Sequence, residues 1–340
     1  MNHIDRTLQY GSALSCYPAS AAGEWGYTGG RLATLGEMPA GVRAEAAKVP
    51  TYLGLDSYSL DGNKIRDWNK ARVEGAISFA IFASNWGTFP GAAFSREWPR
   101  IRDAGLVRGA YLFLRFPNPT NDRKYGPCPA PTDQAKTFIK TVGKLEQSDL
   151  PPSLDVEFPG DGRRITGLTA QQCLDRVRAA WRVLKDFYGV APIIYTSARV
   201  WREDLNNSPA QDLVESPLWL AYYPFKSGLA QRGPQVTRFK PPVPPPWGDS
   251  TNWWIHQYQG DALKFPGFAT GNVDMNRFHA IGRGAAGDQV KWVQRRLGIA
   301  QDGNFDAATQ ALGAFQRKRG VPETPVIDPR TFAFLCWSNP

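Results

Sequence analysis

Short apolar segments recur along the chain between about residues 52 and 280 and alternate with helical patterns. Eight of them have the length and composition of strands: residues 52–56, 77–83, 108–114, 153–157, 191–196, 218–223, 253–258 and 272–275. Several are apolar on both faces, as in residues 77–82, which is typical of a parallel sheet covered by helices. The larger part of the chain is therefore predicted to fold around a sheet that is buried on both sides.

Helical patterns separate the first strands, at residues 63–72, 95–103, 131–145 and 169–187. The last is the clearest, because Thr169 can cap its start and Gly189 lies just beyond its end. After the fifth strand the helical signal fades. Eight strands with about five crossover helices predict an α/β fold, an incomplete β/α barrel. The proline-rich residues 241–246 predict an extended surface loop.

The two ends of the chain differ from this middle part in composition and in the pattern of apolar residues. Residues 1–50 are rich in Gly and Ala and predict an irregular extension, with a short helix near residues 42–48. A boundary near residues 282–284 precedes a segment with apolar positions of its own. We therefore expect an extension at 1–50, a catalytic barrel at 51–281 and a small all-α domain at 285–338.

The chain is basic, with a formal net charge of +9 and a pI of about 9.4. Such a balance suits a polyanionic partner, which leaves nucleic acid, acidic lipid and bacterial cell wall as candidates. The positive charge is dispersed, and its densest cluster spans only residues 317–319. This dispersion disfavours nucleic acid, and the short cluster is typical of a solvated helix face.

The sequence also gives expectations about location and metals. No stretch approaches the ~18–20 apolar residues of a membrane span, and the first residues lack a signal-peptide layout. We expect a chain made in the cytoplasm, without membrane insertion. The four cysteines form no C-x-x-C and only three histidines are present, so neither a metal site nor a cofactor is expected. Free thiols are favoured, and one long-range disulfide stays open.

Two acidic residues end the fourth predicted strand. Residues i and i+2 of a strand share a face, so Asp155 and Glu157 would lie side by side with Cα atoms ~7 Å apart. Burying two carboxylates costs several kcal/mol unless they are paired or have a function. The alternative is an edge strand whose acids meet water, Arg163 or Arg164.

Two further acids strengthen the functional reading. Asp56 ends the first predicted strand and Asp274 lies in the last. In a closed barrel these strands are neighbours, and the active face is formed by the C-terminal ends of strands. Four acids would then converge there. Crowded like charges keep one carboxyl protonated, as glycosidic cleavage requires of a general acid beside a stabilising anion.

Over residues 50–280 the chain resembles glycoside hydrolase family 25, the Chalaropsis-type lysozymes. The segments that carry the resemblance follow in order at barrel spacing: GLDSYS (54–59), GAYLF (109–113), LDVE (154–157), PIIYTS (192–197), LWLAYY (218–223), WIHQY (254–258) and VDMN (273–276). The resemblance implies an incomplete β/α barrel. It also implies metal-free cleavage of the β-1,4 bond between N-acetylmuramic acid and N-acetylglucosamine.

The resemblance also implies roles for the acids. Glu157 would be the general acid, and Asp155 would orient or charge-stabilise the N-acetyl group of the substrate. Asp56 and Asp274 would shape the site. The substrate's own acetamido oxygen would then attack, an exception to the two-carboxylate rule.

Aromatic residues in the matching segments are expected to line the sugar cleft, with packing in the core as the alternative. They are Tyr111, Tyr195, Trp219 and Tyr258. One departure is Leu112, which stands where His is common in the family and so predicts an altered inner contact.

The segment 285–338 resembles the three-helix peptidoglycan-binding module found in many wall hydrolases. The matching pieces are GDQVKWVQRRL (287–297), DGNFDAAT (302–309), AFQR (314–317) and VIDPRT (326–331). The resemblance implies that bacterial peptidoglycan is the partner of both domains, because a binding module raises the effective concentration of enzyme at an insoluble polymer. A monomer without nucleic-acid binding is expected.

The sequence therefore predicts a muramidase, with a phage endolysin released through a holin as the favoured setting. An effector injected by a secretion machine is the alternative. A non-catalytic wall-binding protein is the rival from another class, and the retained acids argue against it. The absence of a D-x-x-D-x-D-x-E run argues against a chitinase-like enzyme.

Overall fold

The computed structural model describes residues 49–58, 66–158, 162–248, 251–268 and 273–338. The expected short helix at 42–48 and nearly all of the extension at 1–50 lie outside these residues, as does Cys16. The other three cysteines, Cys128, Cys173 and Cys336, are free thiols. Among the described helices, none has the length and apolar character needed to cross a membrane.

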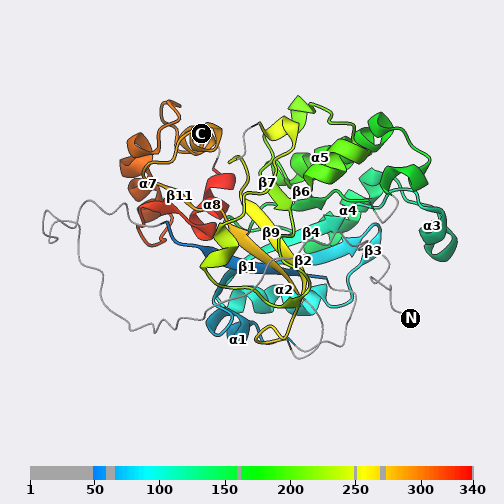
Figure 1. The fold of residues 1–340 in the computed structure, drawn as a ribbon, viewed down its shortest axis with the longest axis horizontal. Helices are drawn as coiled ribbons and strands as arrows, with labels where there is room; N and C mark the ends of the chain where they lie inside the picture. Colours follow the sequence, from blue (N-terminus) through cyan, green and yellow to red (C-terminus); the bar gives the residue numbers. More distant parts are fainter. Residues whose placement is uncertain (1–48, 59–65, 159–161, 249–250, 269–272, 339–340) are drawn as a thin grey trace, which may run out of the picture. The chain divides into compact units, whose positions relative to one another are not determined.

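Eight strands of the described residues close into a ring, which confirms the predicted barrel (Figure 1). In chain order they are β1 (Tyr52–Ser57), β2 (Ile77–Trp86), β4 (Val107–Phe113), β5 (Ser153–Asp155), β6 (Ile193–Thr196), β7 (Leu218–Ala221), β9 (Ile255–Leu263) and β10 (Val273–Phe278). Ring neighbours are parallel except β10, which runs antiparallel to both β9 and β1. Two short strands lie outside the ring and pair with ring strands: β3 (Phe89–Pro90) with β2 and β8 (Gly228–Leu229) with β9.

Helices cover the first half of the barrel, as the sequence predicts. They are α1 (Trp68–Val73), α2 (Phe94–Asp103), α3 (Pro119–Tyr125), α4 (Pro131–Val142) and α5 (Ala170–Tyr188). Helix α5 begins with a capping box in which Thr169 and Gln172 exchange hydrogen bonds, and it ends at Gly189 with a left-handed φ of 73°. Only glycine takes this conformation at little cost.

Short helical turns replace long helices in the second half. They are η3 (Gly162–Thr166), η4 (Val200–Asp204), η5 (Gln211–Leu213), η6 (Pro234–Thr237) and η7 (Pro245–Trp247). The expected extended surface loop at 241–246 is wrong in part, because Pro246 and Trp247 are buried. Proline fits the first positions of a 3₁₀ turn, and the Trp247 indole N–H donates to the Ser216 carbonyl at 2.9 Å.

The side chains of the barrel strands separate into an inner and an outer layer. Residues such as Phe79, Ile81 and Tyr111 fill the interior. Their neighbours in sequence, such as Ala80 and Phe82, pack in the outer layer with the surrounding helices. Where a strand is regular, this alternation assigns each residue a side and so decides which polar groups face the barrel interior.

The C-terminal segment forms three helices, α6 (Asp288–Arg296), α7 (Phe305–Lys318) and α8 (Pro329–Cys336), shown orange to red in Figure 1. A two-stranded ladder of β11 (Ile281–Gly282) and β12 (Val326–Ile327) ties them to the end of the barrel. Phe332 of α8 stacks on Trp254 with ring centroids 4.5 Å apart. Barrel interior and helices thus share one hydrophobic cluster, and residues 49–340 are one compact unit.

Candidate active site

Two of the predicted acids face each other across the first and last strands of the barrel. Asp56 and Asp274 are direct partners in the β1–β10 register, and both are buried, with 4% and 9% of their surface exposed. Asp274 lies near the start of β10. Because β10 is antiparallel, its start reaches the barrel end where the parallel strands finish. Asp56 and Asp274 therefore lie together at one end of the barrel because β1 pairs with β10 to close it.

Two amide side chains hold this acidic pair. Gln257 of β9 donates from Nε2 to Asp56 Oδ1 at 2.6 Å and, more weakly, to Asp274 Oδ2 at 3.5 Å. Asn276 donates from Nδ2 to the same Asp56 oxygen at 2.7 Å. The backbone N–H of Asp261 donates to Asp274 Oδ1 at 2.8 Å. Hydrogen bonds of this kind stabilise the ionised carboxylate and offset its burial.

Aromatic hydroxyls and an indole complete the network. Tyr195 and Tyr223 both donate to Gln257 Oε1, at 2.7 and 2.5 Å. The indole N–H of Trp219 donates to Asn276 Oδ1 at 2.8 Å. With their oxygens engaged on this side, the two amides are fixed so that their NH₂ groups point at Asp56. The two amides and their aromatic partners therefore fix the orientation of the acidic pair from inside the barrel.

Asp155 and Glu157 belong to the same end of the barrel. β5 lies between β4 and β6, so the alternative of an edge strand is wrong. Leu154 and Val156 pack in the outer layer, and strand alternation therefore directs the two acids to the inner side. Asp155 is the register partner of Tyr195, whose hydroxyl bonds Gln257 and thereby connects β5 to Asp56.

The two neighbouring acids differ in exposure. Asp155 is buried at 6%, whereas Glu157 is partly exposed. Two carboxyls in unlike surroundings can take different protonation states, which is how glycosidases divide the roles of acid and stabiliser. Among the described residues, no group of three or more His, Cys, Asp and Glu side chains is arranged to hold a metal ion.

The predicted aromatic residues do not all reach this site. Tyr111, Tyr195 and Trp219 lie inside the barrel, with Tyr195 and Trp219 rings 4.7 Å apart. With 4%, 6% and 1% of their surface exposed, they pack in the barrel core below the acids, which is the alternative to lining a cleft, and they offer little ring surface to a sugar. Tyr258 does not join them: it is fully buried in the outer layer, and its hydroxyl donates to the Gln231 carbonyl at 2.6 Å. Strand alternation explains this correction, because Tyr258 follows the inward-facing Gln257.

The same alternation removes Leu112 from the site. Leu112 is fully buried and packs in the outer layer, so the expected change of an inner contact at this position is wrong. Its neighbour Tyr111 is the residue of β4 that faces the interior.

Sequence reasoning missed several residues of the site: Gln257, Asn276, Tyr223, and an aromatic group of Trp86, Phe89 and Tyr125. Asn276 is two residues beyond Asp274, so strand spacing alone places it on the same face. The aromatic group lies at the level of the acids, because Phe113 is the register partner of both Trp86 and Asp155. Trp86 stacks on Phe89 at 5.7 Å, and Phe89 is 40% exposed. This group forms an aromatic rim beside the acids.

Gln257→Leu is expected to lower turnover at least tenfold, because it removes the donor to Asp56 and the Oε1 atom to which the Tyr195 and Tyr223 hydroxyls donate. The free energy of unfolding should fall by about 1–3 kcal/mol. Gln294→Leu is the matched control, since Gln294 is an equally buried glutamine that bonds Asp302 and the Asn304 carbonyl far from the mouth. Equal turnover per folded molecule in the two variants would refute a positioning role for Gln257.

His256 lies on the outer side of β9, where it supports the strand that carries Gln257. It is fully buried, accepts a hydrogen bond from Arg277 Nε at 3.0 Å and contacts the Tyr222 carbonyl at 2.7 Å. Burial, together with the nearby Arg277 charge, lowers the pKa of His256 to about 3. The folded protein therefore keeps this imidazole neutral throughout the mildly acidic range.

This pKa predicts a loss of stability on acidification. Between pH 6.5 and 3 the unfolded chain binds a proton at His256 that the folded chain rejects, so the free energy of unfolding falls as pH falls. The expected contribution between pH 7 and 5 is about 2 kcal/mol. Denaturant titrations at both pH values should show a smaller difference for His256→Gln than for the wild type, and identical differences would contradict the assignment.

Comparison with known proteins identifies the family of the barrel. The family model of glycosyl hydrolases family 25 matches residues 55–267, more than half of the 340-residue chain. Lysozyme M1 from Streptomyces globisporus is 27% identical over 221 residues, which cover 63% of this chain and 63% of that protein. The uncharacterized protein YegX from Escherichia coli (strain K12) is 29% identical over 206 residues, 56% of this chain and 66% of YegX.

Solved structures show the same fold. The bacterial lysozyme from Streptomyces coelicolor superposes with a TM-score of 0.53 at 24% identity, covering 68% of this chain and 93% of that one. The muramidase from Acremonium alcalophilum gives a TM-score of 0.51 at 22% identity, with coverage of 67% and 93%. The match spans between 44% and 66% of the length of the curated relatives. On the family match and the barrel, this chain belongs to glycosyl hydrolases family 25.

Proposed function

We propose that the chain is a muramidase that hydrolyses the β-1,4 bond between N-acetylmuramic acid and N-acetylglucosamine in bacterial peptidoglycan. The observation that carries the proposal is the acidic mouth of a family 25 barrel, with Asp155 and Glu157 on β5 and the held pair Asp56 and Asp274. Lysozyme M1 and the autolytic lysozyme from Clostridium acetobutylicum, 28% identical over 173 residues, support it.

In this proposal Glu157 is the general acid, because it is the β5 carboxyl that is partly exposed and so accessible to a glycosidic oxygen. It gives its proton to the glycosidic oxygen as the bond from that oxygen to C1 breaks. The acetamido carbonyl oxygen of the same sugar bonds to C1, and Asp155 stabilises the positive charge on that group. Water then bonds to C1 as the bond between C1 and the acetamido oxygen breaks, and it gives a proton to the Glu157 carboxylate, so the sugar keeps its configuration.

The aromatic rim of Trp86, Phe89 and Tyr125 supports a polymeric sugar substrate, because partly exposed aromatic rings beside a catalytic face offer apolar surface to sugar rings. The formal charge of +9 suits a polyanionic wall. We further propose that residues 285–338 contact this wall. A non-catalytic scaffold has no need of Gln257 and Asn276 to hold a buried carboxylate, which costs free energy.

The test is to incubate the purified full chain with peptidoglycan, reduce the products with borohydride and identify the new ends by mass spectrometry. The proposal expects muramitol ends. Glucosaminitol ends, cleavage within the stem peptide, or intact glycan would each overturn it. This experiment tests the reaction and not its biological setting, because a phage endolysin and an injected effector would cleave the same bond with the same residues.

A further inference from the structure

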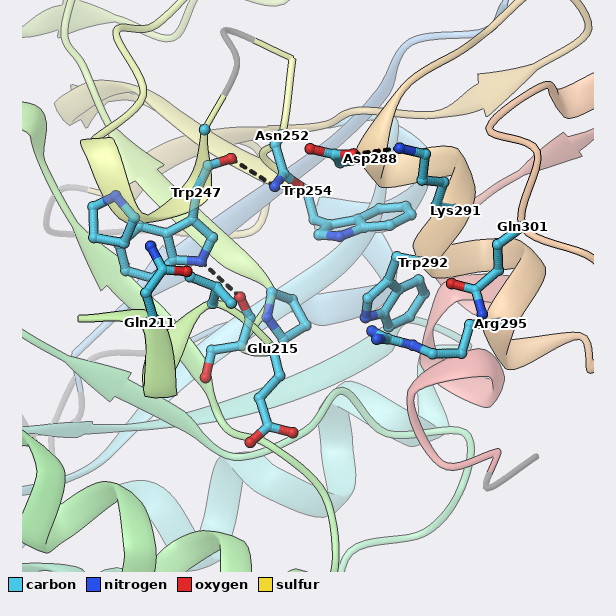
Figure 2. Close-up of a pocket in the computed structure, with 15 residues that line it drawn as sticks. Gln211, Glu215, Trp247, Asn252, Trp254, Asp288, Lys291, Trp292, Arg295 and Gln301 are labelled. Carbon is cyan, nitrogen blue, oxygen red and sulfur yellow. Dashed lines mark hydrogen bonds and ion pairs between the residues drawn. The ribbon is translucent and has the colours of Figure 1, made fainter. Parts of the chain in front are cut away.

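A cavity of about 350 Å³ lies away from the acidic mouth, between the barrel and helix α6 (Figure 2). The barrel contributes Glu215, Ser216 and Trp247, and α6 contributes Trp292 and Arg295. Its volume lies within the range of small-ligand sites, about 300–1,000 Å³. Because the walls come from both parts of the chain, neither part forms the site alone.

The charges in this cavity leave one cation without a partner. Asp288 forms an ion pair with Lys291 at 3.2 Å, and Glu215 pairs with Lys185 outside the cavity lining. Arg295 is exposed and forms no ion pair with a carboxylate of the described residues. A ligand here therefore meets a free guanidinium, which prefers a carboxylate.

A second donor in the cavity also lacks a partner. The indole N–H of Trp292 is shielded from solvent and has no acceptor among the described residues. A buried donor without an acceptor costs free energy, and a ligand that carries a carbonyl or carboxylate oxygen removes that cost. Guanidinium and indole lie on the α6 side of the same cavity in Figure 2.

The tryptophans of the cavity do not offer open faces for a sugar. Trp254 is only 2% exposed, stacked on Phe332 at 4.5 Å and covered by Trp292 at 5.1 Å. Trp247 is likewise 2% exposed and packs edge-on against Trp201 at 4.9 Å. The apolar walls therefore suit short aliphatic side chains better than a stacked pyranose ring.

We propose that this cavity binds the carboxylate-bearing stem peptide of peptidoglycan, with Arg295 and the Trp292 indole N–H as the groups that receive its oxygens. The proposal rests on the proposed function, since it assumes that the wall polymer is the substrate. It assigns the peptide to the junction of barrel and α6, and the glycan to the acidic mouth.

The experiment titrates the full-length protein with the pentapeptide L-Ala-γ-D-Glu-L-Lys-D-Ala-D-Ala, by calorimetry and by NMR of the tryptophan indole N–H signals. The signal that is absent from Trp292→Phe identifies Trp292. We expect this signal to shift on titration, and the Kd to rise about tenfold or more in Arg295→Gln. Lys318→Gln removes an exposed charge elsewhere on the helices and should leave the Kd unchanged. The peptide with all carboxylates amidated should bind as weakly as the wild-type peptide binds Arg295→Gln.

Three outcomes overturn the assignment: no binding, equal Kd for wild type and Arg295→Gln, or displacement of the peptide by the peptide-free disaccharide. Turnover of peptide-free glycan is measured in the same samples. Turnover without peptide binding would refute the cavity proposal but not the muramidase proposal. Peptide binding without turnover would refute the muramidase proposal but not peptide binding in the cavity.

Discussion

Glu157→Gln is expected to abolish cleavage of peptidoglycan while leaving the fold intact. The amide cannot deliver the proton that the leaving oxygen needs, and loss of general acid catalysis costs about 10²–10⁴-fold in rate or more. Glu157 is partly exposed and isosteric with Gln, so the unfolding midpoint should hardly move. Release of reducing ends from sacculi, together with the unfolding midpoint, measures both.

Glu74→Gln is the matched control, because Glu74 is a surface residue with 58% of its side chain exposed and an i,i+4 partner in Lys70. An exposed pair contributes at most about 1 kcal/mol, so this variant should keep wild-type turnover. Asp155→Asn should be severe as well, and Asp56→Asn or Asp274→Asn less so. Wild-type-like turnover by Glu157→Gln would remove this residue from the chemistry.

The barrel could be predicted because its strands carry a strong local signal. Residues 77–82 are apolar on both faces, as a strand of a sheet covered on both sides requires, and each predicted strand overlaps an observed one. The ends of strands are less predictable: β2 continues through Asn85 and Trp86, where polar residues break the pattern. Helix α3 was missed because it buries none of its residues. It is started by Asn118, whose side chain accepts from the N–H groups of Thr120 and Asn121.

The candidate site was predictable as far as its acids and no further. Carboxylates in apolar strands stand out in a sequence because their burial needs a reason. Gln257 and Asn276 do not stand out, because neutral amides are common and their importance comes from partners more than 200 residues away, as in the bonds to Asp56. The prediction for Tyr258 is wrong because an aromatic residue in a matching segment suggests a sugar cleft. Side chains alternate along a strand, and Tyr258 follows the inward-facing Gln257, so its ring points to the outer layer.

The C-terminal helices show a different limit of sequence reasoning. Residues 285–338 have their own apolar pattern, which favours a separable module. The structure shows a pattern that continues into the barrel: Phe332 packs on both Trp254 and Phe278, at 4.5 and 5.3 Å. The indole N–H of Trp337 donates to the Asp149 carbonyl at 2.8 Å. Apolar residues that face a neighbouring part of the same chain look the same in sequence as residues that face their own core.

A chain that ends at residue 282 is therefore expected to be strongly destabilised. It would expose Trp254 and Phe278, now 2% and 4% exposed, and each large side chain loses about 1.5–3 kcal/mol on exposure. Together with the lost β11–β12 ladder, the loss in the free energy of unfolding is on the order of 5 kcal/mol, comparable with the whole stability of many domains.

Phe332→Ala in the full chain removes contacts between α8 and the barrel core, and it should lower the free energy of unfolding by about 3–5 kcal/mol. Arg330→Ala, which removes only an exposed hydrogen bond to the Gly105 carbonyl, serves as the control. Thermal unfolding of the three proteins, each beside the wild type, tests this. An unchanged midpoint in the shortened chain would mean that the barrel holds its own core, and that the helices add binding without stability.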